Sequence, residues 1–363
     1  MRRKLAAMVA AATILLALPA AASARIPASF SGMAPQGDTT SFDYSLMRSS
    51  GVHSVRLPMF WAAIQAENRY LADPDFDGFD RQVKLAAEEG IRVFPFLYST
   101  PPWVAPDHET LPVGSDWERW AWRVFLKDAE ARYGPGGSFW EEHDQIDYLP
   151  IRRWEIWNEP NIVTFAEPTG PRRYAELLRE SGRVLHRADP GSKVIVGGLF
   201  GRPLQIPPNT APGAFLAGIY KARGVKPHFD GVALHPYVAD ASAMRAMILN
   251  LRRVMKEHRD GGTELLVTEL GWGSDSFESR WERGLNGQAR ELSQSMAMLS
   301  VNRRAWRIGG VWWFSWRDHD GACQFCDSAG LLTEDREAKP SWYLFNAWTG
   351  GDPDTVTRAS FGD

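Results

Sequence analysis

The chain has 363 residues, of which 44% are hydrophobic and 23% are charged, which is typical of a globular protein. The net charge is −3 and becomes −6 if the basic head described below is removed, and a surface of this charge argues against nucleic acid as a partner. The length allows two domains, although one barrel of alternating strands and helices can also reach it.

The first 24 residues have the pattern of a secretory signal peptide. A basic head at 2–4 precedes an apolar run at 5–22, and Ala22-Ser23-Ala24 fits the small-x-small cleavage pattern. We therefore predict a secreted protein, extracellular or periplasmic. Cleavage would remove the three positive charges of the head and move the net charge from −3 to −6. The apolar run is near the lower length limit of a membrane span, so a cell-surface anchor by an uncleaved N-terminus is the alternative.

Apolar, β-branched segments bounded by turn residues predict eight strands. They cover 30–33, 52–57, 91–97, 153–157, 193–197, 231–234, 265–268 and 310–314. Helical periodicity lies between them. The predicted helices cover 42–49, 79–89, 116–133, 171–189, 213–223, 243–257, 288–302 and 341–348.

Eight strands alternating with eight helices predict a single-domain α/β fold, the (β/α)8 TIM barrel, over residues 28–350, followed by a polar tail at 351–363. A doubly wound open sheet is the alternative. The first strand lacks the Gly-rich phosphate fingerprint of a dinucleotide-binding fold, which counts against that alternative.

The chain has two cysteines, Cys323 and Cys326. In an oxidising compartment this spacing favours a small loop closed by a disulfide. A redox-active pair would need a thioredoxin-like βαβ setting. A zinc site would need two further ligands at suitable spacing, and we find none.

In a barrel of this kind, chemistry belongs at the carboxyl ends of the strands. The fourth predicted strand lies in "RRWEIWNEPN" (152–161) and ends at Asn158 and Glu159, because Pro160 cannot donate to the sheet. Aromatic neighbours such as Trp157 would raise the pKa of Glu159, as a general acid requires. Strict alternation puts Asn158 and Glu159 on opposite faces, so both reach one site only if the chain twists or bulges there.

The seventh predicted strand ends in the same way, since "ELLVTELGW" is apolar up to Thr268 and then places Glu269 before Gly271. Strands four and seven can point at one central space. Two carboxyl groups facing that space, one of them kept protonated, are the apparatus of glycoside hydrolysis.

These motifs carry a resemblance to a known group of enzymes. "WEIWNEPN", "ALHPY", "VTELGW" and "WWFSWRD", on strands four, six, seven and eight, resemble the retaining glycoside hydrolases of clan A. Within that clan the chain is most similar to family thirty-nine and related endo-acting bacterial glycosidases. The likeness covers nearly the whole chain after the predicted signal peptide.

The resemblance implies a role for each matched residue. Glu159 would be the acid/base and Glu269 the nucleophile, while Asn158 would hold the sugar 2-hydroxyl. The remaining expected binding residues are Arg56, which braces the nucleophile, His235 and Tyr237 after strand six, and Trp313 or Trp316 as an aromatic floor. Arg56 and the Tyr237 hydroxyl would lower the pKa of Glu269.

Other side chains have structural interpretations beside functional ones. Glu155 lies inside the fourth strand, so we expect it to pair with a side chain of another strand. Trp61, Trp103 and Trp272 could stack on sugar or pack loops.

We therefore predict a secreted retaining glycosidase that hydrolyses O-glycosidic bonds of an oligosaccharide or polysaccharide by double displacement, with a lean towards endo action. We expect a carbohydrate substrate, no cofactor, no metal, no nucleic-acid partner, no membrane span after signal cleavage, and a monomer. The alternatives are a non-hydrolytic carbohydrate-binding barrel, a transglycosylase and a metal-dependent hydrolase.

Overall fold

The computed structural model describes residues 27–202, 206–275, 279–321, 323 and 325–356. The predicted signal peptide and the end of the tail lie outside these residues. Among the helices of the described ranges, none is long and apolar enough to cross a membrane.

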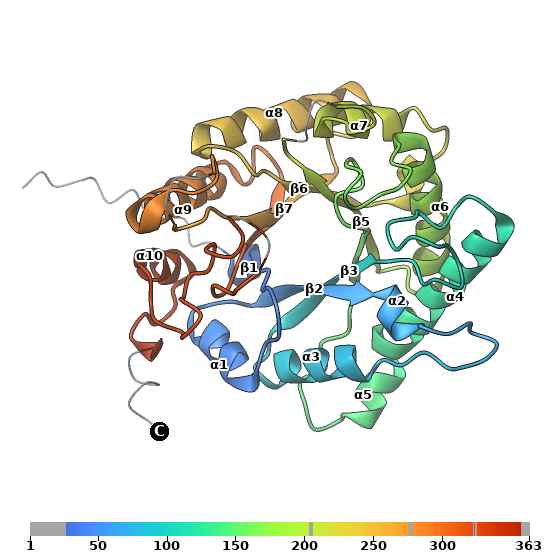
Figure 1. Ribbon diagram of the computed structural model, residues 1–363, viewed down its shortest axis with the longest axis horizontal. Helices are drawn as coiled ribbons and strands as arrows, with labels where there is room; N and C mark the ends of the chain where they lie inside the picture. Colours follow the sequence, from blue (N-terminus) through green and yellow to red (C-terminus); the bar gives the residue numbers. More distant parts are fainter. Residues whose placement is uncertain (1–26, 203–205, 276–278, 322, 324, 357–363) are drawn as a thin grey trace, which may run out of the picture.

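Eight parallel strands pair in sequence order and close into a barrel, with β1 pairing to both β2 and β8 (Figure 1). The strands are β1 Ser31–Met33, β2 Ser54–Phe60, β3 Arg92–Tyr98, β4 Arg153–Ile156, β5 Lys193–Phe200, β6 Gly231–His235, β7 Glu264–Leu270 and β8 Ile308–Trp313. The predicted (β/α)8 fold is confirmed, and each predicted strand overlaps an observed one.

Helices surround the barrel (Figure 1). They are α1 Ser41–Ser49, α2 Trp61–Ile64, α3 Asp77–Glu88, α4 Asp116–Tyr133, α5 Ser138–Glu142, α6 Pro171–Ala188, α7 Pro212–Tyr220, α8 Ala241–Glu257, α9 Gly284–Asn302 and α10 Pro340–Thr349, with short 3-10 turns η1 Ala28–Phe30 and η2 Lys226–His228. The sequence pattern missed α2 and α5, which have only four and five residues and so show little periodicity.

Capping explains where several helices begin. The Ser115 hydroxyl accepts a hydrogen bond from the Glu118 amide, which fixes the start of α4 at Asp116. Pro171 occupies the first position of α6, where its missing N–H costs nothing.

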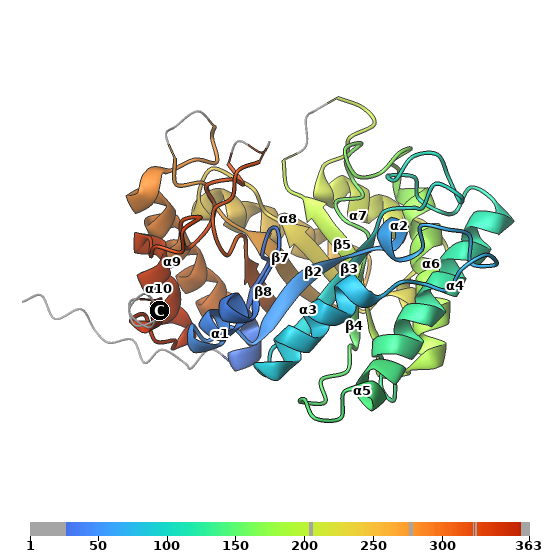
Figure 2. The same ribbon diagram turned by 60° about the horizontal axis from the view of Figure 1, so that its bottom comes forward.

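The inside of the barrel has an apolar layer and a polar layer. The apolar layer is a cluster of side chains from several strands and from the position directly after β1, namely Ala34, Phe94, Ile195, Ala233, Leu266 and Trp312. Nearer the carboxyl ends of the strands the inward side chains are polar, and they include Arg56, Glu155, His235 and Thr268, all buried. The loops that follow the strands rise at this end of the barrel, which Figure 2 shows from the side.

Cys323 and Cys326 form a disulfide with their Cα atoms 5.2 Å apart, in the segment between β8 and α10. The predicted small loop is therefore confirmed. The segment after α10 returns to the body of the protein, where Val356 is buried and the Trp342 indole donates to the Pro353 carbonyl.

Candidate active site

The chain leaves β4 through an unusual backbone path. After the strand ends at Ile156, Trp157 has φ 73° and Glu159 has φ 42°, values that non-glycine residues rarely adopt. These two left-handed residues break the alternation of the strand. Asn158 and Glu159 therefore both reach the barrel mouth, as the predicted twist required.

Glu159 lies 5% exposed at the mouth. Its Oε1 is 2.8 Å from His235 Nδ1, and His235 is fully buried at the end of β6. Burial raises the pKa of Glu159 well above its usual value, and the negative charge of Glu269 adds to the shift, while Arg56 opposes it. This environment favours the protonated carboxyl.

Glu269 sits near the end of β7, where the pairing with β8 becomes irregular between Val267 and Leu270. Arg56 Nη1 donates to Glu269 Oε1 at 2.6 Å, and the Tyr237 hydroxyl donates to Oε2 at 2.5 Å. Both contacts match the predicted bracing.

The pKa of Glu269 differs from our expectation. Burial raises it, and this effect outweighs the hydrogen bonds and charge of Arg56 and Tyr237, which act in the opposite direction. Arg56 and Tyr237 lower the pKa of Glu269 as we expected, but the net pKa is raised because burial, which we had not considered for this residue, has the larger effect. The expected order of the two pKa values has a geometric basis, because Arg56 and Tyr237 donate hydrogen bonds to Glu269 that favour its ionised form, and neither donates to Glu159.

The two carboxyl groups face one small space. One oxygen of each carboxylate and a ring nitrogen of His235 lie within 4.8 Å of one another. Such a triplet could hold a metal ion, but the Arg56 guanidinium lies 2.6 Å from Glu269 and supplies the positive charge there. A cation in the same space would be repelled by Arg56.

Arg56 joins three strands through one guanidinium. Its Nε and Nη2 donate to the two oxygens of Glu155 at 2.9 and 2.8 Å, and Nη2 also donates to Asn158 Oδ1 at 3.0 Å. The guanidinium lies 3.9 Å from the centre of the Phe96 ring. Glu155 therefore has the structural pairing that we expected, and Arg56 fixes the acids of β4 and β7 relative to each other.

We predict that Arg56→Met lowers the free energy of unfolding by about 3–5 kcal/mol, because it leaves the fully buried carboxylate of Glu155 without its partner. Denaturant unfolding would measure the change. The matched control is Arg56→Met combined with Glu155→Gln, in which an amide oxygen can still accept from the Gly198 amide. If the double variant is no more stable than the single one, an unpaired charge is not the cause.

A cleft of about 710 Å³ opens from Glu269 and Arg56 towards the segments after β1 and β2. Phe60, Phe96 and Phe314 give it aromatic walls. Trp313 and Trp316, expected as its floor, are each 1% exposed and do not line it. Trp313 packs against Trp272, and Trp316 packs against Trp342. The aromatic side chain that reaches the cleft from the end of β8 is Phe314. The expected positions were therefore wrong by one residue for Trp313 and by two residues for Trp316.

The remaining tryptophans in question belong to the packing of the protein. Trp61 and Trp272 are fully buried, and Trp103 contacts Trp61 edge to face. The structure thus favours loop packing over sugar stacking for Trp61 and Trp272.

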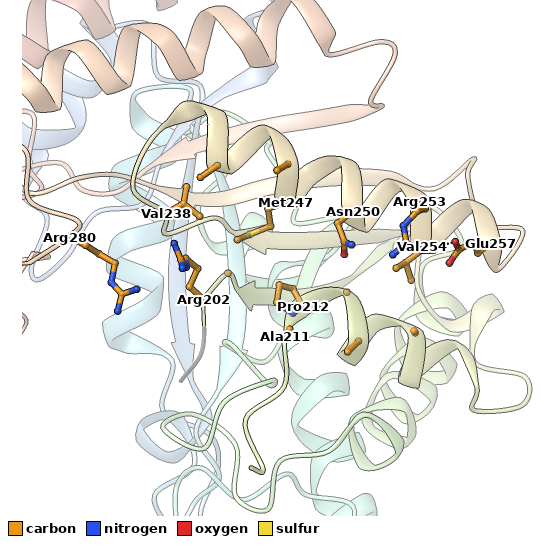
Figure 3. A pocket seen from close by; sticks show the side chains of 16 residues that line it. Arg202, Ala211, Pro212, Val238, Met247, Asn250, Arg253, Val254, Glu257 and Arg280 are labelled. Atoms are coloured by element: carbon orange, nitrogen blue, oxygen red, sulfur yellow. Dashed lines mark hydrogen bonds and ion pairs between the residues drawn. The ribbon is translucent and has the colours of Figure 1, made fainter. Parts of the chain in front are cut away.

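A second hollow, of about 930 Å³, lies between α7 and α8 (Figure 3). Pro212, Met247 and Asn250 lie along its middle, Arg253 and Glu257 lie at one end, and Arg202 and Arg280 lie at the other (Figure 3). Its lining comes mostly from α7 and α8, with Arg202, Val238 and Arg280 from the segments after β5, β6 and β7, and it contains neither Glu159 nor Glu269. We therefore assign the candidate site to the barrel mouth.

Three residues of the site were not singled out from the sequence. Phe314 lies in the segment "WWFSW", where the three tryptophans were the more obvious candidates for a sugar-binding aromatic residue. Thr268 contacts His235, and Gly198 leaves room for the His235 ring, where a Cβ would lie 1.9 Å from Nε2. The double glycine at 197–198 inside a predicted strand was the available signal, because glycine there often marks a close approach.

The chain matches no model of a protein family and no curated protein. Solved structures do share its fold. A family 39 glycoside hydrolase from Bacteroides cellulosilyticus has a TM-score of 0.65 at 20% identity, over 89% of this chain and 63% of that one. A monomeric beta-xylosidase from Caulobacter crescentus has a TM-score of 0.60 at 18% identity, over 88% and 67%.

An intracellular xylanase from Thermoanaerobacterium saccharolyticum has a TM-score of 0.60 at 16% identity, over 87% of this chain and 94% of the xylanase. The chain therefore spans less than two thirds of the Bacteroides protein but almost all of the xylanase. These likenesses define the fold class, a (β/α)8 barrel of the kind seen in solved glycosidases. Among them is a structure from family 39, the family that the motifs resemble.

Proposed function

We propose that the protein is a retaining glycoside hydrolase of the clan A type, similar to family 39. The observation that carries the proposal is the pair Glu159 and Glu269, with carboxylate oxygens within 4.8 Å of each other. Retaining enzymes hold their carboxyl groups about 5–5.5 Å apart and inverting enzymes about 6.5–9.5 Å apart. The short separation favours the retaining mechanism.

The two acids would act in turn. Glu269 attacks the anomeric carbon and forms an ester bond, while the bond to the leaving oxygen breaks and that oxygen takes the proton of Glu159. A water molecule then attacks the same carbon and gives its proton to the Glu159 carboxylate. The ester bond breaks, and the sugar and the Glu269 carboxylate are released. A sugar hydroxyl in place of water would give transglycosylation.

The cleft supports a substrate larger than a single sugar. The cleft borders Glu269 and Arg56 but not Glu159. It would therefore bind the part of the substrate that becomes bonded to Glu269, and not the leaving group. Its volume of about 710 Å³ is in the upper part of the range of small-molecule sites. A cleft of this size has room for more than one sugar unit, which is compatible with the expected endo action on an oligosaccharide or polysaccharide. Together with the signal-like N-terminus and the disulfide, it is consistent with a secreted enzyme that degrades an extracellular polysaccharide.

A panel of aryl glycosides and polysaccharides tests the proposal. We expect release of the aryl group or of reducing ends from at least one member, with the anomeric configuration retained and with no effect of a metal chelator. A metal-dependent hydrolase would lose activity with the chelator. A carbohydrate-binding barrel without catalysis would bind a member of the panel and leave every bond intact.

The pH dependence provides a separate prediction. Catalysis needs Glu269 ionised and Glu159 protonated, so activity falls on the acidic side with the pKa of Glu269 and on the alkaline side with that of Glu159. Burial raises both pKa values, which moves both limbs of the profile to higher pH than exposed carboxyl groups would give. Tyr237→Phe removes a hydrogen bond that favours ionised Glu269, so the pKa of Glu269 should rise. The acidic limb of the profile should then move to higher pH by about 1–2 units. A profile of kcat/KM whose acidic limb does not move would contradict the role of Tyr237.

A further inference from the structure

The imidazole of His235 connects Glu159 to a buried hydroxyl. Its Nδ1 lies 2.8 Å from Glu159 Oε1, and its Nε2 lies 3.0 Å from Thr268 Oγ1. Burial and the charge of Arg56 lower the pKa of His235 well below its usual value, so the ring is neutral. A neutral imidazole donates from one nitrogen and accepts at the other, which leaves two possible proton arrangements.

Thr268 distinguishes the two arrangements. It is fully buried, and among the described residues its hydroxyl has a hydrogen bond only with His235 Nε2. If Nε2 carried the ring proton, the hydroxyl would accept and its own hydrogen would have no acceptor, which is unfavourable in a buried position. If Nδ1 carries the proton, the hydroxyl donates to Nε2 and every group is satisfied.

Gly198 holds the ring in the orientation that this contact requires. A Cβ at this position would lie 1.9 Å from His235 Nε2 and 2.4 Å from Cδ2, so the ring edge lies directly against the backbone of β5. The pairing of β5 with β6 shifts register between Val196 and Leu199 at this point. The ring therefore cannot turn towards β5 to find another partner.

We propose that Thr268 is a positioning residue, which holds His235 with its proton on Nδ1 so that Glu159 Oε1 always accepts and Oε2 alone carries the acid proton. The inference rests on the proposed function, because it assigns the proton to the oxygen that the leaving group would meet. It also explains how the carboxylate is stabilised once that proton has been given away, since Nδ1 donates to it in both states.

Several other charged or titratable groups surround Glu159, His235 and Thr268. The Thr268 variants described below leave all of these groups unchanged. Glu269 Oε2 lies 3.5 Å from His235 Nδ1, and Arg56 acts on all three groups. The groups that surround the pair of Glu159 and His235 are Glu269 on β7, Arg56 on β2, Glu155 on β4, Tyr98 on β3 and Tyr237 after β6.

The kinetic test compares Thr268→Val with Thr268→Ser. Valine keeps the shape and removes the hydroxyl, so His235 loses its preference for Nδ1 and ionised Glu159 loses a donor. We expect kcat/KM to fall about tenfold for aryl glycosides with poor leaving groups and little for those with good ones. The pKa of Glu159 should rise, which moves the alkaline limb to higher pH. Serine should restore both properties.

A loss that is equal for both substrate classes, with an unmoved alkaline limb, would mean that Thr268 only packs the core and would overturn the proposal.

The tautomer can also be measured without catalysis. In the protein labelled with ¹⁵N-histidine, the signals lost in His235→Asn identify this ring among the eight histidines. We expect Nδ1 to have the shift of a protonated nitrogen and Nε2 that of an unprotonated one, with a change in Thr268→Val. Protonation of Nε2 in the wild-type protein would overturn the inference. If the wild type cleaves no glycoside, the proposed function fails and this measurement still decides the tautomer.

Discussion

Replacing Glu269 by Gln is expected to lower kcat/KM by about 10⁴-fold or more, because in the proposed mechanism Glu269 is the residue that forms the ester with the anomeric carbon. The amide of glutamine has the size of the carboxyl group but is not a nucleophile. Rates on an aryl glycoside with a good leaving group measure the loss, since such a substrate needs little help from Glu159.

The same role predicts covalent trapping. A 2-fluoro sugar with a good leaving group should inactivate the wild-type protein and add one sugar to the peptide that contains Glu269, as mass spectrometry of a digest would show. Glu264→Gln is the matched control. It changes a glutamate at the opposite end of β7 that forms an ion pair with Arg153 at 3.5 Å, and it should label normally. Labelling of another acid, or an active Glu269→Gln variant, would refute the assignment.

Glu159→Gln is expected to separate substrates by their leaving groups. Hydrolysis of substrates with poor leaving groups should fall by about 10²–10⁴-fold, because the leaving oxygen no longer receives a proton. Substrates with good leaving groups should still form the glycosyl intermediate and release their first product in a burst. Comparison of burst and steady-state rates across a series of aryl glycosides measures both effects.

Azide gives an independent check on Glu159. In Glu159→Ala the space left by the carboxyl group admits a small anion that needs no general base. Added azide should raise the turnover of an activated substrate and give a glycosyl azide of retained configuration. Equal losses for all leaving groups, with no effect of azide, would show that Glu159 is not the acid.

The sequence was sufficient to predict the barrel because its strands are short apolar runs separated by turn residues and periodic helices. The candidate acids Glu159 and Glu269 could be selected from the sequence for a related reason, since each is a charged residue at the carboxyl end of a buried strand. The expectation that Glu155 is structural also holds, because an inward acid below the mouth has to find a partner, and Arg56 supplies one.

Other features depend on three-dimensional properties that a linear pattern does not contain. The positive φ values of Trp157 and Glu159 decide which way the side chains point, and neither residue type predicts them. Phe314 lines the cleft and its tryptophan neighbours do not, and this depends on the direction of each side chain where the backbone leaves β8. The pKa of Glu269 depends on the balance between burial and two contacts, and only coordinates give the depth of burial.

The guanidinium of Arg56 also has a consequence for how the protein responds to heat. Arg56 lies on β2 and donates hydrogen bonds to Glu155 on β4 and Glu269 on β7. The groups assigned to catalysis therefore also hold together strands that are not neighbours in the barrel. Local unfolding at this end of the barrel would break the Arg56 contacts, and would therefore misalign the two acids and separate the strands at the same time. Loss of activity on warming should therefore coincide with cooperative melting, and amide protons around these strand ends should be among the slowest in the molecule to exchange with deuterium.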